Sequence, residues 1–182
     1  MNWEQNESDK GSDGRLAMTL WLQVTMAGLV MSLLFNGAVA KLWLAYPRAV
    51  VSMLPKPIQE LAPQATVDQR KTIRWRLLWI YLLTVGIGLV TTAFLPIRGF
   101  LPLFITGYWQ MFLVNLGDLI GLDWLFRQKN LPRLMIPGTE DCPAWQTESW
   151  MLYLGLPEHL LLWPLIVCPL TGLLYQVLYF FN

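Results

Sequence analysis

The sequence has few charged residues for its length, and this scarcity indicates the class of protein. Only 14% of the 182 residues are charged, whereas 55% are hydrophobic. This composition is typical of a multi-pass membrane protein rather than of a soluble domain. Four long stretches contain no charged residue, and each is close to the roughly 20 residues that a helix needs to cross a hydrocarbon core. They are Leu16–Ala40, Leu77–Ile97, Gly99–Gly117 and Leu160–Asn182.

Histidine and cysteine are also scarce, which removes several kinds of site. His159 is the only histidine, so one chain cannot supply two histidine ligands to a haem, and no zinc-binding motif is present. No lysine lies deep in an expected span, where it could form a retinal-type Schiff base. Neither the P-loop of nucleotide-binding proteins nor the G-x-S-x-G motif of serine hydrolases occurs. Cys142 falls in an expected loop and Cys168 in the last run, so we expect two free thiols. The sequence indicates no particular cofactor.

The four uncharged runs predict an all-α integral membrane bundle. Residues 1–15 are polar and too poor in apolar side chains to fold alone, so we expect a flexible tail. Thr66 and Gln69 form an S/T-x-x-E/Q capping box, which predicts that a helix begins there. Within a transmembrane domain of residues 16–182, the spans are expected at about 16–44, 77–95, 100–126 and 157–181.

Basic residues are concentrated on one side of this expected bundle. The loops after the first and third spans hold most of the lysine and arginine, whereas the other side holds only Lys10, Arg15 and Arg98. Because cytoplasmic loops carry an excess of basic residues, both termini are expected outside the cell. The predicted location is therefore a plasma membrane, in bacteria the cell inner membrane.

The net charge and the position of the basic residues indicate the partners. A formal charge of +1, with no basic patch on a soluble face, gives no reason to expect nucleic acid. A basic run beside two tryptophans precedes the second span and is expected to contact anionic lipid at the cytoplasmic face; a specific phosphoinositide or nucleotide site is the alternative. A protein partner or a homo-oligomer is a further expectation. The basic run contains Arg70, Lys71, Arg74, Trp75, Arg76 and Trp79.

Several polar residues are expected at a similar depth near the cytoplasmic ends of the spans. At a rise of about 1.5 Å per residue, Asn36 and Asp118 lie about two helical turns from the interface. Pro157 suits the first turn of the last helix, where the helix dipole favours Glu158. We therefore predict a ligand-binding polar pocket that opens to the cytoplasm, with Glu140 or Asp141 as a lid. Its residues are Asn36, Thr84, Asn115, Asp118, Glu158 and His159.

Each of these residues also has a purely structural interpretation. Asp118 can reach the interface or cap a neighbouring helix, and Glu158 with His159 can serve as an interfacial capping pair. Asp123 lies four residues before Arg127, the favourable order for a helical ion pair, and is expected to be mainly structural. A divalent-metal site is an open alternative, since hard cations take oxygen ligands. Its candidate ligands are Asp118, Asp123, Glu158 and His159.

Other residues are expected to shape the backbone or the packing. Gly117 and Gly121 form a GxxxG pair, the spacing that lets two membrane helices approach closely. Pro137 and Gly138 mark a turn in the loop after the third span.

The stretch D-L-I-G-L-D-W-L-F, followed by P-R-L-M-I-P-G-T-E, resembles a family of small, uncharacterised bacterial multi-pass membrane proteins. Their shared features are an Asp-x4-Asp-Trp helix end and a Pro-Gly-Thr-Glu loop, and the resemblance covers residues 115–140. It implies a location in the bacterial inner membrane and supplies no reaction. It marks Asp118, Asp123, Trp124 and the segment 137–140 as candidate functional residues.

Three functions remain open from the sequence. A non-enzymatic membrane component that binds a partner or small ligand at the pocket comes first, because no catalytic motif emerges. A small proton-coupled transporter would use Asp118 as its titrating group. A metal-dependent membrane enzyme acting on a lipid head group would use the carboxylates and a metal ion.

Overall fold

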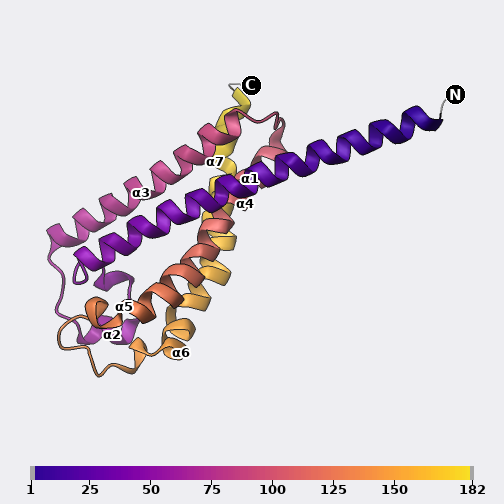
Figure 1. Cartoon of the computed structure of the whole chain (residues 1–182). Helices are drawn as coiled ribbons and strands as arrows, with labels where there is room; N and C mark the ends of the chain where they lie inside the picture. Colours follow the sequence, from indigo (N-terminus) through magenta and orange to yellow (C-terminus); the bar gives the residue numbers. More distant parts are fainter. Residues whose placement is uncertain (1–2, 181–182) are drawn as a thin grey trace.

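The computed structural model describes the backbone of residues 3–180 and the side chains of residues 15–180. Within these residues the chain is helical, without a strand, and forms a bundle of long helices (Figure 1). Four helices are long and apolar enough to cross a membrane, which confirms the predicted all-α bundle with four spans. They comprise Arg15–Ala45, Val67–Ala93, Phe100–Leu134 and Thr147–Phe180.

Two of the four spans are single α-helices, and the other two are built from several consecutive helical segments, some of them π-helical. The first two spans lie in α1 (Trp3–Ala45) and α3 (Val67–Ala93). The third comprises α4 (Phe100–Gly117), the π-helical segment η2 (Asp118–Phe126) and α5 (Arg127–Leu134). The fourth comprises α6 (Thr147–Trp150), η4 (Met151–Gly155), η5 (Glu158–Val167), α7 (Cys168–Leu174) and η6 (Tyr175–Phe180). The loops carry η1 (Val51–Met53), α2 (Lys56–Leu61) and η3 (Pro143–Trp145).

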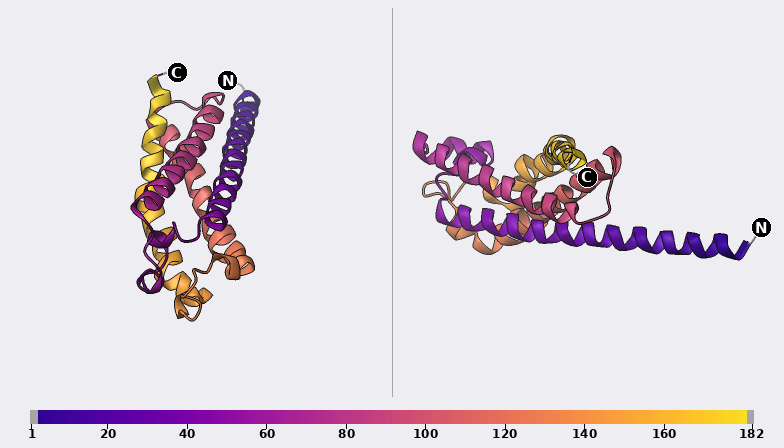
Figure 2. Two further views of the ribbon diagram at one scale, coloured as in Figure 1. Left: turned by 90° about the vertical axis from the view of Figure 1, so that its left-hand side faces the viewer. Right: turned by 90° about the horizontal axis from the view of Figure 1, so that it is seen from above.

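The two ends of the chain lie toward the same end of the bundle (Figure 2, left). Residues 3–15, expected as a flexible tail, continue α1, which projects well beyond the other helices (Figure 2, right). The opposite end of the bundle carries the two longer connections.

One predicted helix start is confirmed and another is wrong. Thr66 caps α3 as expected, because its hydroxyl accepts from the Gln69 N–H while the Gln69 side chain accepts from the Thr66 N–H. The fourth span, however, begins at Thr147 rather than at Pro157. Proline is tolerated inside this helix because π-helical turns lie on both sides of it, and such turns relax the α-helical ladder that proline disrupts. Glu158 and His159 therefore lie inside a helix, not at its N-terminus.

α4 is the central helix, since it packs against both α1 and α7. Gln110 of α4 joins two neighbours: its nitrogen donates to the Val24 carbonyl at 3.4 Å, and its oxygen accepts from the Tyr175 hydroxyl. A Cβ at Gly88 or at Gly107 would collide with the Tyr175 side chain. These glycines therefore allow the helices to close around a fully buried Tyr175.

The GxxxG pair is used only in part. A Cβ at Gly117 would meet the side chains of Ser32 and Asn36, so α1 and α4 cross closely there. Gly121 has no atom within 4 Å of the equivalent position. Close packing therefore explains Gly117 but not Gly121.

The two connections at the end of the bundle opposite the termini, residues 46–66 and 135–146, fold together into what we call the loop cap. Val51, Ile58 and Ile136 are buried in one apolar cluster with residues from the adjoining helix ends. Gly138 takes a positive φ of 91°, which places the turn at the predicted Pro137-Gly138. The Gly138 N–H donates to the Glu140 carboxylate at 2.8 Å. The two connections therefore form a packed structure with its own core.

Candidate functional site

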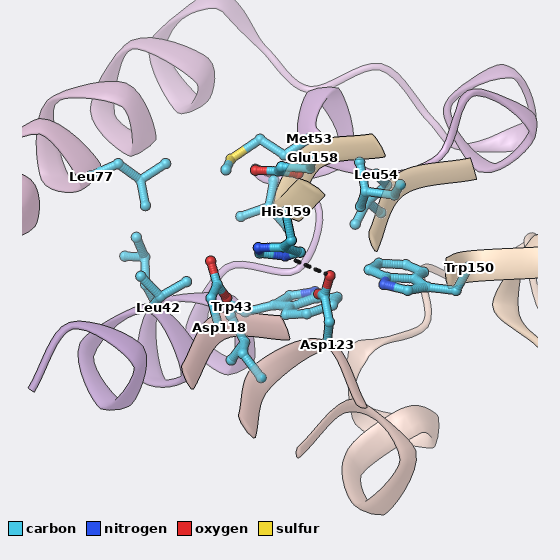
Figure 3. Close-up of a pocket in the computed structure, with 14 residues that line it drawn as sticks. Leu42, Trp43, Met53, Leu54, Leu77, Asp118, Asp123, Trp150, Glu158 and His159 are labelled. Carbon is cyan, nitrogen blue, oxygen red and sulfur yellow. Dashed lines mark hydrogen bonds and ion pairs between the residues drawn. The ribbon is translucent and has the colours of Figure 1, made fainter. Parts of the chain in front are cut away.

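Asp118 and Asp123 lie in η2 and extend toward the same cavity (Figure 3). In an α-helix, at 100° per residue, positions five apart would point about 140° away from each other. A π-helix instead joins residues five apart through its hydrogen bonds, so its wider turns bring such positions toward one face. The π-helical geometry of η2 therefore brings together two aspartates that regular α-helical geometry would place on different sides.

His159 is held between two side chains of the third span. Its Nδ1 lies 2.6 Å from Asn115 Oδ1, and its Nε2 lies 3.2 Å from Asp123 Oδ2. Asn115 Nδ2 donates to the His159 carbonyl at 3.0 Å, which fixes the orientation of the amide. Both Asn115 and His159 are almost fully buried. The single histidine is therefore rigidly positioned by two independent contacts.

These contacts determine where protons lie on the imidazole. An amide oxygen can only accept a hydrogen bond, so Nδ1 of His159 carries a proton. Nε2 must then either donate to an ionised Asp123 or accept from a protonated Asp123. In both arrangements, the His159–Asp123 pair shares one proton in addition to that on Nδ1.

Two further carboxylates line the same cavity. Glu158, next to His159, accepts a long hydrogen bond of 3.5 Å from the Trp163 indole. Asp118 is 9% exposed, and no group in the described part of the chain donates a hydrogen bond to its carboxylate. Among the described residues, the only ion pair within 4 Å is that of His159 with Asp123. Asp118 and Glu158 therefore have no cationic partner there.

The cavity has a volume of about 80 Å³ and mostly apolar walls. The loop cap contributes Val50, Met53 and Leu54, and the indoles of Trp43 and Trp150 stack with ring centroids 5.6 Å apart. Neither indole N–H finds an acceptor among the described residues, although both are buried. Each of these two lining residues therefore keeps a buried, unsatisfied N–H. The rest of the lining consists of Val39, Leu42, Leu77, Leu122 and Leu154 with the acidic residues and His159.

The predicted ion pair between Asp123 and Arg127 is wrong. Arg127 is fully buried and donates to the backbone carbonyl of Asp123 at 2.9 Å rather than to its carboxylate. It also donates to the Trp145 carbonyl at 2.7 Å and to the Thr147 hydroxyl at 3.0 Å. Its guanidinium lies 4.8 Å from the Trp150 ring centroid. Arg127 thus ties η2 to the loop cap, which leaves the Asp123 carboxylate free for His159.

The structure brings together only part of the predicted pocket. Asp118, Glu158 and His159 line the cavity and Asn115 holds His159 in place beside it, whereas Asn36 and Thr84 do neither. Asn36 lies on the face of α1 that packs against Gly117 of α4. It therefore donates to the Val114 carbonyl of α4, at 3.2 Å. The Thr84 hydroxyl donates to the carbonyl one turn earlier, at Ile80.

The predicted lid and the expected metal ligands also differ from the structure. Glu140 and Asp141 are exposed and do not line the cavity, since Glu140 closes the Gly138 turn instead. Over the part of the chain that the structure describes, no group of three or more His, Cys, Asp or Glu lies close enough to hold a metal ion. The four candidate metal ligands share a cavity but do not converge on one point.

Sequence reasoning missed the aromatic and loop contribution to this site. Trp43 at the end of α1 lines the cavity, as do Met53 and Leu54, which lie in a loop with no motif. The one signal in the sequence is the position of Trp150 between a polar segment and an apolar run, and in the structure Trp150 is buried.

Comparisons of the chain with protein-family models, with curated proteins and with solved structures gave no match. The resemblance to small bacterial membrane proteins therefore stays a prediction.

Proposed function

We propose that this chain is a membrane-embedded binding protein for a small organic cation, held in the acidic cavity at the loop-cap end of the bundle. By the bias of basic residues, we also propose that this end faces the cytoplasm of a bacterial inner membrane. The observation that carries the proposal is the group of three carboxylates and one imidazole in one small, apolar-walled cavity.

The charge balance of the cavity favours a cationic ligand. The His159–Asp123 pair is neutral overall when it shares one proton, but Asp118 and Glu158 have no such partner. Burying an unpaired carboxylate costs several kcal/mol, so it must be neutralised by a proton or by a cation. A bound cation and a bound proton therefore compete for the same position.

The shape and lining favour an ammonium group over a metal ion. A divalent metal needs several ligands that converge at about 2.0–2.6 Å, and the described side chains do not provide that geometry. An ammonium group needs only acceptors at hydrogen-bond distance, and a short alkyl stem suits walls of leucine and valine.

Ethylammonium and ethanolammonium should stabilise the purified protein, and the Asp118→Asn variant should lose this effect. At 100 times its Kd, a ligand stabilises the folded state by about 2.7 kcal/mol. For a chain of this size, that corresponds to a rise in Tm of about 5–10 °C. The measurement is a thermal unfolding series in detergent at fixed ionic strength.

Glu148→Gln is the matched control, because Glu148 is an exposed carboxylate on the same span and outside the cavity. Propanol, which has a similar size but no charge, should leave the wild-type Tm unchanged. An equal shift with propanol, or no shift with either amine, would contradict the proposal even if Asp118→Asn does not fold.

The shared proton favours a second candidate function, a small proton-coupled transporter. His159 and Asp123 hold one exchangeable proton beside Asp118 and Glu158, which is the arrangement of a proton relay. Proteoliposomes should therefore take up protons along a pH gradient, and Asp123→Asn should reduce the rate at least tenfold. A pH-sensitive dye inside the vesicles measures the rate, with Glu148→Gln as the control.

The protonation state of the His159 imidazole provides an independent test of the proposed proton relay. Since His159 is the only histidine, ¹⁵N-histidine labelling gives the signals of one ring. Nδ1 should appear protonated, and Asn115→Leu should release this preference. An unprotonated Nδ1 in the wild type would refute the proton assignment, and uptake unchanged by Asp123→Asn would refute the relay.

A further inference from the structure

A second surface lies outside the acidic cavity, where the start of α3 meets the loop cap. It is an open groove of about 660 Å³, and we call it the basic groove. Three of its lining residues, Arg70, Lys71 and Arg74, are cationic and lie on one side of α3. The other lining residues are Ser52, Val67, Trp75 and Leu78.

The three cations of the basic groove are not neutralised by the protein. Within the part of the chain that the structure describes, none of them forms an ion pair within 4 Å. Asp68 lies on the same helix turn but does not line the groove. Arg76, by contrast, is occupied, because its guanidinium lies 4.5 Å from the ring centroid of Tyr46. The basic groove thus presents a local charge of +3 to a ligand.

Apolar side chains lie directly beside these cations and are exposed. Val67 is 70% exposed, Trp75 54% and Leu78 42%. A soluble anion, such as phosphate or the triphosphate of a nucleotide, would contact the cations but leave Val67, Trp75 and Leu78 uncovered. A ligand with an anionic head and an acyl chain would use both.

The position of the basic groove along the helix agrees with the depth of a lipid head group. α3 has 27 residues and a length of about 40 Å at 1.5 Å per residue, whereas the hydrocarbon core is about 30 Å thick. The excess length places its first turns in the head-group region if Ala93 ends near the opposite boundary. Trp75, 54% exposed and about 27 Å along the helix axis from Ala93, suits the interface itself.

We propose that the basic groove is a binding site for one anionic phospholipid. Its phosphate would lie among Arg70, Lys71 and Arg74, and its acyl chain would run over Trp75 and Leu78 toward the bilayer. This site is independent of the acidic cavity, since the two share no lining residue.

Native mass spectrometry of the detergent-purified protein tests this site with phosphatidylglycerol and phosphatidylcholine of identical acyl chains. One phosphatidylglycerol should stay bound per chain, and phosphatidylcholine should not. At about a fivefold loss per contact, the combined variant Arg70→Gln, Lys71→Gln and Arg74→Gln should weaken retention about 100-fold. Trp75→Ala should weaken it less, by removing the acyl contact.

The matched control is the combined variant Arg48→Gln, Lys129→Gln and Arg133→Gln. These are exposed cations at the same end of the bundle, and their replacement changes the net charge equally. An equal loss in this control would show only a general charge effect and would overturn the proposal. Equal retention of phosphatidylcholine, or displacement of the lipid by glycerol phosphate or ATP, would also overturn it.

Discussion

Replacing Arg127 with alanine should destabilise the protein by about 3–5 kcal/mol, a loss comparable with breaking a buried charged network. The guanidinium is fully buried and joins three elements through Asp123, Trp145 and Thr147. Its removal would leave the Trp145 carbonyl without its donor and open a gap beside Trp150. Denaturant unfolding in micelles, followed by tryptophan fluorescence, measures this free energy.

Arg133→Ala is the control for this experiment, since Arg133 lies in the same helix and is exposed. It should change stability by less than about 0.5 kcal/mol. Arg127→Lys should recover only part of the loss, because one ammonium group cannot reproduce the planar fork that reaches three acceptors. If Arg127→Ala were as stable as Arg133→Ala, the loop cap would not depend on this residue.

Gly88→Ala should destabilise the bundle by about 3 kcal/mol, whereas Gly86→Ala should stabilise it slightly. The added methyl group at Gly88 would collide with the Tyr175 hydroxyl, the Gln110 side chain and Met31. At Gly86 nothing lies within 4 Å, so the same change in the same helix meets open space. Equilibrium unfolding of the two variants provides the comparison.

A second substitution identifies the collision. Tyr175→Phe removes the hydroxyl closest to the new methyl group, so the penalty of Gly88→Ala should shrink by about 1 kcal/mol or more in that background. Strict additivity of the two changes would show that the Gly88 penalty has another origin.

The fold was largely predictable because its main signals are local. Uncharged runs of spanning length identify the four membrane helices, since lipid does not tolerate an unpaired charge in their middle. The capping box at Thr66 is equally local, because its two hydrogen bonds join residues three apart. Such features need no knowledge of the distant chain.

The site was only half predictable because it depends on departures from α-helical geometry. Uniform rotation by 100° per residue separates Asp118 from Asp123, and only the π-helical turns of η2 reunite them. Rules for regular α-helices also predicted a helix start at Pro157 and an ion pair between Arg127 and Asp123, and both predictions were wrong. The actual partners of Arg127, at Trp145 and Thr147, lie across the loop cap, and such contacts have no signature in sequence spacing.

The loop cap couples its own stability to the occupancy of the cavity. Val50 and Leu54 belong to the apolar core of the cap and at the same time form a wall of the cavity. Breaking that wall would require local unfolding of part of the cap core, and such unfolding would release a bound ligand. By linkage, a bound ligand protects the cap amides from hydrogen exchange, and substitutions that loosen the cap weaken binding by the same free energy.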